Sequence, residues 1–293
     1  MKLLVFGCNG QLGRDLMLQA PRQGIDVVGA DLPQCDITSP RDLEETIDRA
    51  GELSVIINAA AYTAVDRAES EVETAFSVNR DAVGRMARIC QTKQITLIHI
   101  STDYVFDGSQ RHPYGPSDPI APMGVYGRSK AEGERAVREA CERHVIVRTS
   151  WLFGAHGPNF VKTMLRLGKE RDELRVVDDQ IGSPTYSGDL AGALLAVAAH
   201  VVLKAGGWGT YHFCNAGVVS WYGFTRRIFE IAGAYDHFRV QHILPISTAE
   251  YPVAAPRPAY SVLDCAGLEA RFGIKRRPYE AGLADMLHLL YER

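Results

Sequence analysis

The sequence lacks any block of basic residues and any strong excess of one charge. Its 293 residues carry 32 Lys and Arg against 35 Asp and Glu, which gives a formal net charge of -3. Proteins that bind nucleic acid generally present a basic field to the phosphates. We therefore expect no nucleic-acid partner.

Long hydrophobic runs are also missing. The longest apolar stretch, 191–203, has 13 residues and includes His200, whereas a membrane-spanning helix needs about 20 apolar residues. This stretch is typical of a buried helix. The apolar run at the N-terminus ends at Gly7 and is too short for the core of a signal peptide. The sequence thus predicts a cytoplasmic protein that has no membrane partner.

Cysteine and histidine occur without the spacing of a metal site. The six cysteines form no CxxC pair, and the nine histidines form neither an HxxxH nor an HExxH group. A zinc site, a disulfide framework and a histidine base are therefore not expected. We expect most of the cysteines to be small core residues; they are Cys8, Cys35, Cys90, Cys141, Cys214 and Cys265.

Apolar segments of strand length alternate with helical patterns through the first half of the chain. Near-continuous apolar strands separated by helices are typical of a parallel sheet covered on both faces. The predicted class is α/β, a doubly wound parallel sheet of the Rossmann type. We expect strands at 2–6, 26–30, 53–61, 96–102 and 144–150, and helices at 11–20, 41–50, 73–91 and 129–143.

Beyond residue 150 the rhythm changes and indicates a second, smaller α+β lobe. Helices are expected at 160–171, 189–200, 223–234 and 279–292, strands at 174–177 and 209–217, and a proline-dotted segment at 244–258. We expect 1–150 and about 186–220 to form the dinucleotide-binding domain. About 151–185 and 221–293 would then form the substrate-binding lobe.

A glycine-rich turn, GCNGQLG from Gly7 to Gly13, joins the first strand to the first helix. Such a turn brings backbone N–H groups and a helix N-terminus to a pyrophosphate. Asp31, at the end of the next strand, is placed to accept hydrogen bonds from the adenine ribose. Asp31 disfavours a 2′-phosphate and Arg14 favours one, so NADH and NADPH both stay open. The alanines at 59–61 leave room for the nicotinamide ribose, or equally pack a helix on the sheet.

Reactive side chains follow the fourth expected strand. Thr102 and Asp103 stand at its carboxyl end, the same sheet edge as the glycine turn. Tyr126 and Lys130 are four residues apart, which places them on one face of a helix. Lys130 can reach the nicotinamide ribose and lower the pKa of Tyr126 from about 10, so that Tyr126 gives a proton to a carbonyl oxygen. Ser101 or Thr102 would hold that oxygen, or else cap the next turn.

These motifs, in this order, resemble the extended short-chain dehydrogenases/reductases: GxxGxxG, NAAA at 58–61, STDYVFDG at 101–108 and YGRSK at 126–130. Four further segments are similar to the dTDP-4-dehydrorhamnose reductase family, and the resemblance spans nearly the whole chain. They are RTSWLFG at 148–154, NFVKTMLRLGKER at 159–171, DDQIGSPT at 178–185, and RP at 257–258 followed by LD at 263–264. Tyr104 stands where the related 4,6-dehydratases carry Glu, which argues against dehydration.

The resemblance implies reduction of the C4 ketone of dTDP-4-dehydro-L-rhamnose by NADH or NADPH, giving dTDP-L-rhamnose for polysaccharide biosynthesis. It implies Tyr126 as proton donor, Lys130 as its electrostatic partner and ribose ligand, and Thr102 as the hydroxyl that positions the oxygen. The expected cofactor-binding residues are Gly7, Asn9, Gly10, Gln11, Leu12, Gly13, Asp31, Asp36, Ile37, Ala59, Ala60, Ala61, Ser101, Tyr126 and Lys130. The expected substrate-binding residues are Thr63, Val65, Thr102, Asp103, Tyr104, Trp151 with its flat ring face, and, towards the nucleotide, Asn159 and Arg257.

The chain departs from the family at a metal site. Some members form dimers around a magnesium ion bridged by glutamates. This chain has Asp15 at the first of these positions and Gly188, followed by Asp189, at the second. Because Mg²⁺ prefers carboxylate oxygen, Gly188 argues against the bridge. We expect no metal, and either a monomer or a homodimer.

Two other functions stay open. One is a non-catalytic, NADP-binding regulatory subunit, because a methionine adenosyltransferase partner in animals resembles the same family. The other is a different nucleotide-sugar ketoreductase or epimerase on the same scaffold. The complete set of Tyr126, Lys130 and Thr102 favours an enzyme.

Overall fold

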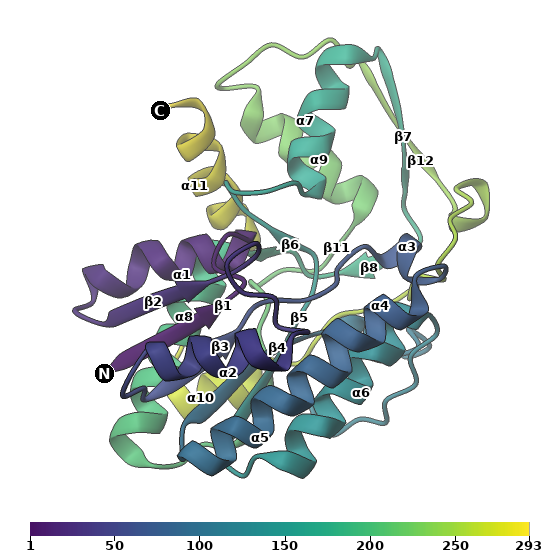
Figure 1. Ribbon diagram of the computed structural model, residues 1–293. Helices are drawn as coiled ribbons and strands as arrows, with labels where there is room; N and C mark the ends of the chain where they lie inside the picture. Colours follow the sequence, from purple (N-terminus) through teal and green to yellow (C-terminus); the bar gives the residue numbers. More distant parts are fainter. Residues whose placement is uncertain (293) are drawn as a thin grey trace.

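Six parallel strands form the central sheet of the computed structural model, which describes residues 1–292 (Figure 1). Their order is β10-β5-β4-β3-β1-β2, so β2 lies on one side of β1 and β3 lies on the other. This reversal of the strand order opens a crevice at the carboxyl edge of the sheet. The strands are β1 (Lys2–Phe6), β2 (Asp26–Ala30), β3 (Val55–Asn58), β4 (Thr96–Thr102), β5 (His144–Thr149) and β10 (Gly209–His212). The predicted doubly wound α/β class is confirmed.

Helices cover both faces of the sheet because the strands are apolar on both faces. One face packs on α1 (Gln11–Arg22) and α8 (Ser187–Lys204) through residues such as Leu16 and Leu194. The other face packs on α2 (Pro40–Arg49), α5 (Val83–Lys93) and α6 (Val125–Ala140). By length and composition α8 alone is apolar enough to cross a membrane, within the part of the chain that the structure describes. More than half of it is buried in the core, as expected for a buried helix.

A smaller lobe lies above the carboxyl edge of the sheet (Figure 1). Two paired strands, β7 (Glu173–Val177) and β12 (His242–Ile246), share an aromatic-rich core with α7 (Phe160–Glu170), α9 (Trp221–Ala232) and α11 (Tyr279–Tyr291). β12 falls partly in the segment expected to be irregular; Pro245 is tolerated because this short sheet is made of edge strands.

One helix lies apart from its predicted lobe. Helix α10 (Ala266–Phe272) was not expected, and its Leu268 is buried in the same core as α1 and α8. We therefore correct this part of the predicted division: α10 packs with the Rossmann sheet. The other domain boundaries stay a prediction. The remaining short elements are α3 (Val65–Ala68), α4 (Val72–Phe76), β6 (Leu152–Phe153), β8 (Ile181–Gly182), β9 (Thr185–Tyr186) and β11 (Val219–Ser220), together with the 3-10 turns at Asp103–Val105 and Thr248–Glu250.

The helix expected at 73–91 is interrupted by a π-helical turn, Ser77–Ala82. Its buried Asn79 accepts a hydrogen bond from the Tyr62 N–H at 2.9 Å and donates to the Tyr62 carbonyl at 3.1 Å. The same amide donates to Ser129 Oγ on α6 at 3.0 Å. The irregular turn thus ties the segment after β3 to α6.

A buried ion pair joins α6 to the sheet. Arg148 on β5 donates from Nε and Nη2 to the two carboxylate oxygens of Glu134 on α6, at 2.8 and 2.7 Å. Both side chains are at most 2% exposed. Burial alone would raise the pKa of Glu134, but the hydrogen bonds and charge of Arg148 outweigh it and hold that pKa below its usual range.

We expect Arg148→Met to lower the free energy of unfolding by at least about 2 kcal/mol in urea denaturation, because it leaves a buried carboxylate with the half-exposed Arg138 as its charged partner. Arg135→Met is the matched control. It removes an exposed helix pair with Glu132, so its effect should stay within about 0.5 kcal/mol. Equal effects of the two variants would contradict this account.

Candidate active site

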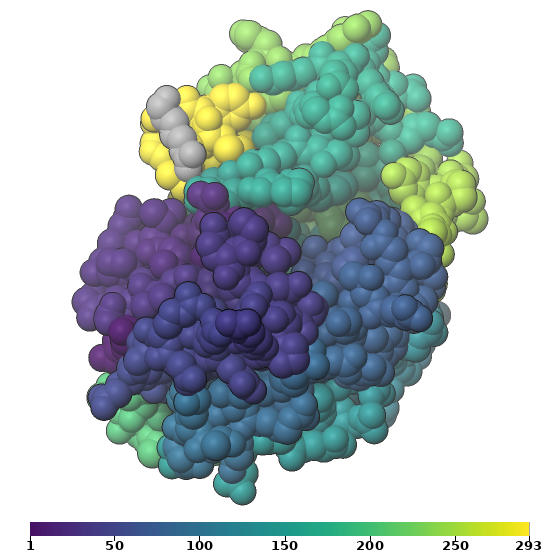
Figure 2. Space-filling model, viewed as in Figure 1, coloured from purple at the N-terminus to yellow at the C-terminus, as the bar shows by residue number. Residues whose placement is uncertain are grey.

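A cleft of about 890 Å³ runs along the carboxyl edge of the sheet, below the smaller lobe. Figure 2 shows the surface hollowed where the purple and blue N-terminal part meets the teal lobe. Every residue expected to bind the cofactor lines this cleft, and so does every expected substrate residue except Arg257. The structure therefore brings together the end of β1, the end of β4 and the start of α6.

Close packing shapes the glycine turn at the floor of the cleft. A Cβ on Gly7, whose φ is +80°, would lie 2.6 Å from the Ala60 nitrogen, and one on Gly13 would lie 2.0 Å from the Gly7 carbonyl oxygen. Only glycine fits at these two positions. Helix α1 begins directly after Gly10 without a side-chain cap, so its first N–H groups face the cleft as an anion site would require. This cradle fits the diphosphate of a dinucleotide.

Asp31 lies beside this turn at the end of β2. Its carboxylate accepts hydrogen bonds from the Asn9 N–H and the Leu32 N–H, each at 2.8 Å. Each oxygen keeps further lone pairs for a ribose hydroxyl. Arg14 Nε donates to the Asn9 carbonyl at 3.3 Å, which holds a positive charge at the same turn.

Helix α6 carries Tyr126 in its first turn and Lys130 in its second turn, and both line the cleft. A Cβ on Gly127 would lie 2.2 Å from the Tyr104 carbonyl oxygen, so glycine lets this helix press against the turn that follows β4. The Tyr104 ring packs edge-on against Tyr126 with centroids 5.5 Å apart. Lys130 Nζ donates to the Ile100 carbonyl at 2.7 Å.

The electrostatics of this pair differ from the prediction. Burial raises the pKa of Tyr126 to about 12, the Thr102 hydroxyl lowers it, and the charge of Asp103 raises it again. Burial lowers the pKa of Lys130 to about 8, against the opposing charge of Glu134. Lys130 is not among the groups that shift the pKa of Tyr126 in this structure, and its ammonium donates to the β4 backbone. Tyr126 is fully protonated at neutral pH, as a proton donor must be.

The end of β4 adds a hydroxyl and a carboxyl. Thr102 Oγ1 accepts from the Tyr104 N–H at 3.2 Å and donates to Asp103 Oδ1 at 3.0 Å, so Thr102 caps the following turn while it lines the cleft. Ser101 is buried and also lines the cleft. Burial raises the pKa of Asp103 to about 6, although hydrogen bonds from Ser261 and Thr102 lower it.

Three expected substrate residues are engaged within the protein. Asn159 caps α7 and donates to Gln11 Oε1 at 2.9 Å while lining the cleft. Trp151 lines the cleft, but its ring is stacked on Trp221. Arg257 does not line the cleft: its guanidinium donates twice to Asp66, at 2.7 and 3.0 Å. The expected role of Arg257 towards the nucleotide stays a prediction.

Several residues of the cleft were not predicted. Most are apolar or small residues that the fold places there. Several adjoin a predicted residue in the sequence, and Thr149, Ser150 and Leu152 lie within the RTSWLFG segment, but none was itself assigned a role. They are Leu32, Cys35, Tyr62, Thr74, Val78, Ile100, Thr149, Ser150, Leu152, Gly157 and Pro158.

Comparisons with known proteins agree with this geometry. The family model of the RmlD substrate binding domain matches residues 1–292. A dTDP-4-dehydrorhamnose reductase from Aggregatibacter actinomycetemcomitans is 44% identical over 97% of this chain and 98% of its own length. The chain belongs to the dTDP-4-dehydrorhamnose reductase family. The expected resemblance is therefore confirmed.

Two solved members of this reductase family have closely similar structures. One, from Clostridium acetobutylicum, has a TM-score of 0.91 and 38% identity, with 99% of each chain covered. Another, from Bacillus anthracis and solved in complex with NADP, has a TM-score of 0.89 and 40% identity, with 97% of this chain and 98% of its own covered.

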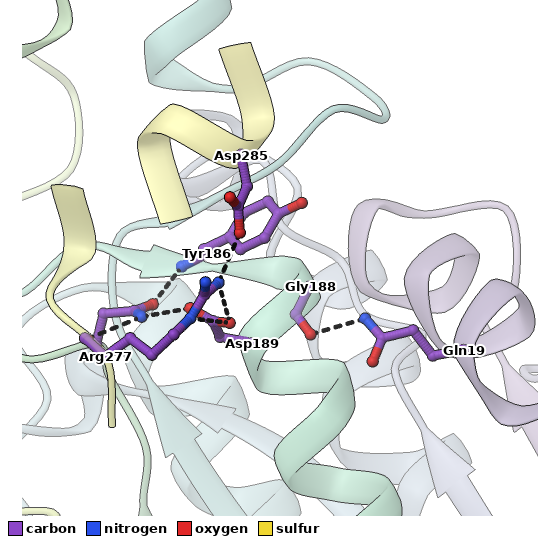
Figure 3. Close-up of polar contacts among 7 residues, drawn as sticks. Gln19, Tyr186, Gly188, Asp189, Arg277 and Asp285 are labelled. Atoms are coloured by element: carbon purple, nitrogen blue, oxygen red, sulfur yellow. Dashed lines mark hydrogen bonds and ion pairs between the residues drawn. The ribbon is translucent and has the colours of Figure 1, made fainter. Parts of the chain in front are cut away.

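The magnesium site of some family members does not fit the residues present here. The buried Asp15 accepts a hydrogen bond from Ser187. Figure 3 shows Arg277 between the carboxylates of Asp189 and Asp285, at 2.6 and 2.8 Å. Across residues 1–292 no three His, Cys, Asp or Glu side chains are grouped to hold a metal ion. A guanidinium already neutralises the carboxylates of Asp189 and Asp285, and the expectation of no metal stays a prediction.

The raised pKa of Asp103 has a consequence for stability. The folded state binds this proton more tightly than an exposed Asp with a pKa near 4. The contribution is therefore complete below pH 4 and is lost as pH rises through about 6. We expect the stability of the wild type relative to Asp103→Asn to fall by about 2 kcal/mol between pH 4 and 7, measured by urea unfolding.

Asp107→Asn serves as the control for that measurement. Hydrogen bonds from the Ser109 backbone, Tyr114 and the Ser109 hydroxyl lower the pKa of Asp107, so its contribution should instead grow as pH rises through its lowered pKa. The same trend in both variants would show that Asp103 is not the group responsible.

Proposed function

We propose that this protein reduces the C4 ketone of dTDP-4-dehydro-L-rhamnose to dTDP-L-rhamnose, with NADH or NADPH as the hydride donor. The observation that carries the proposal is the position of Tyr126, Lys130 and Thr102 in one cleft with the glycine turn. The family membership and the relatives' names support the choice of substrate.

The cleft has two ends with different chemistry. The glycine turn, the N-terminus of α1 and Asp31 offer N–H donors and a ribose acceptor for the dinucleotide. When bound there, the reduced nicotinamide supplies the hydride. Thr63, Val65 and Tyr104 line the remaining space, which we assign to the sugar.

Tyr126 is the proton donor in this proposal. Its pKa of about 12 keeps the phenol protonated until negative charge develops on the carbonyl oxygen. Thr102 Oγ1 stabilises that oxygen by hydrogen bonding and lies on the same side of the cleft. Lys130, with its pKa lowered to about 8, is largely charged at neutral pH, and we assign its ammonium to the nicotinamide ribose.

The decisive experiment supplies dTDP-4-dehydro-L-rhamnose with NADH or NADPH to the purified protein and follows the absorbance of the reduced nicotinamide. We expect oxidation of the cofactor and formation of dTDP-L-rhamnose. Cofactor binding without turnover would favour the regulatory-subunit alternative. Turnover with other 4-ketosugars but not with this one would favour a different ketoreductase.

Replacing Tyr126 tests its role directly. Tyr126→Phe should lower kcat by at least about 10²-fold with the Kd of the reduced cofactor largely unchanged, because only the transferable proton is removed. Tyr114→Phe is the control, since Tyr114 is a buried tyrosine whose hydroxyl donates to Asp107 outside the cleft. Near-normal turnover of Tyr126→Phe would remove Tyr126 from the mechanism.

Asp31 governs the choice of cofactor in this proposal. Asp31→Ala should weaken NADH binding more than NADPH binding, because it removes a ribose acceptor and also a charge that repels a 2′-phosphate. Asp26→Ala, an exposed carboxylate at the other end of β2, is the control. Titration of nicotinamide fluorescence measures the Kd values of NADH and NADPH. Equal losses of affinity for the two cofactors would show that Asp31 does not contact the ribose.

A further inference from the structure

Trp151 has an unusual backbone conformation at the sugar end of the cleft. Its φ is +49°, one of three non-glycine residues with positive φ among residues 1–292. This conformation costs a bulky L-residue roughly 1–2 kcal/mol. It persists only where the surroundings hold it.

The indole of Trp151 is stacked on one side against Trp221, the first residue of α9. The ring centroids are 3.5 Å apart and the planes differ by 7°. Trp221 is supported in turn by Phe160, at 4.4 Å between centroids. Such contact covers one complete face of the Trp151 ring.

Gly182 covers the other face. A Cβ on Gly182 would lie 2.5 Å from Cε2 of Trp151 and 2.8 Å from both Cζ2 and Nε1. An atom in the ring plane beyond Cε2 would be nearer to Cζ2 and Nε1 than to Cε2, so this position lies above the ring. The Trp221 ring is not among its nearest neighbours, which places Gly182 on the opposite side. The predicted flat face of Trp151 is therefore unavailable to a ligand, and its edge faces the cleft.

Two short strands build the slot that holds the ring. β8 carries Gly182, β11 leads into Trp221, and the two strands pair with Val219 opposite Gly182. Ser220 caps α9 by accepting from the Gly223 N–H at 3.0 Å. The main chain of Trp151 is fixed separately, because its carbonyl accepts from the Thr185 N–H at 3.2 Å.

We propose that Gly182 and Trp221 are positioning residues that hold the Trp151 indole edge-on to the sugar end of the cleft. This inference rests on the proposed function for the identity of the ligand. Neither residue lines the cleft, so both act through Trp151. The fixed ring limits the depth of the sugar site, and a ring released from the slot would intrude into it or leave it open.

Steady-state kinetics with the nucleotide sugar test the proposal. Gly182→Ala adds one methyl where the Trp151 ring lies, and Trp221→Ala removes the stack. Each should raise the KM for the sugar by about tenfold or more, with the Kd of the reduced cofactor within about twofold of wild type. Trp221→Phe keeps an aromatic ring against Trp151, so its KM for the sugar should lie much closer to the wild-type value than that of Trp221→Ala.

Tyr235→Ala is the matched control. It removes another aromatic ring of the same lobe, one that stacks on Tyr291 and does not line the cleft, so it should lower the Tm without changing the sugar KM. A KM unchanged in both Gly182→Ala and Trp221→Ala would overturn the proposal. A KM that rises equally in Tyr235→Ala would overturn it as well.

A second measurement does not need turnover. Protein labelled with 5-fluorotryptophan has three tryptophans, whose ¹⁹F signals are assigned with single Trp→Phe variants. In Trp221→Ala the Trp151 signal should broaden or split, while Trp208, which packs on the core beside the sheet, gives an unchanged reference. A sharp, unshifted Trp151 signal would overturn the proposal that Trp221 holds the Trp151 indole. If the wild type shows no turnover but the Trp151 signal broadens or splits in Trp221→Ala, the proposed function fails while the positioning of Trp151 by Trp221 is supported.

Discussion

The buried ion pair between Glu134 and Arg148 fixes α6 on the sheet, and the geometry of the cleft depends on this pair. Apolar contacts are not directional, so they alone would let a helix shift along its sheet. Two parallel hydrogen bonds define one register. Arg148 also donates to the Pro116 carbonyl at 3.2 Å and to His212 Nε2 at 3.3 Å. Burial and the charge of Arg148 lower the pKa of His212 to about 4, so that this ring stays neutral and accepts.

Close backbone contacts at several glycines also fix α6 and the glycine turn in place. At Gly7, Gly13 and Gly127 the backbone of one element lies so close to another that a methyl group would collide with main-chain atoms. Gly133 lies equally close to the Asn79 carbonyl of the π-helical turn. These contacts draw the end of β1, the turn after β4 and the start of α6 into one cleft. The positions of Tyr126 and Lys130 follow from this packing.

The sequence predicts the parts of the fold that repeat and the parts of the site that lie on motifs. Continuous apolar strands predict the sheet, and every residue expected to bind the cofactor lines the cleft. Features that depend on contacts between residues far apart in the sequence could not be predicted. The raised pKa of Tyr126 comes from burial, the pairing of Arg257 comes from Asp66, and the occupied faces of Trp151 come from Gly182 and Trp221. Short strands such as β8 and β11 have too few residues to show a period.

Besides its proposed contact with the ribose, Asp31 has a structural role, because it accepts two hydrogen bonds from the backbone. The carboxylate that we assign to the adenine ribose also accepts hydrogen bonds from the backbone N–H groups of Asn9 and Leu32. In the proposed function, selectivity between NADH and NADPH and the shape of the glycine turn therefore depend on one side chain. A change of preference cannot be made there by altering charge alone. It requires a residue that still offers two acceptors to the same backbone N–H groups, which restricts the substitutions open to this position.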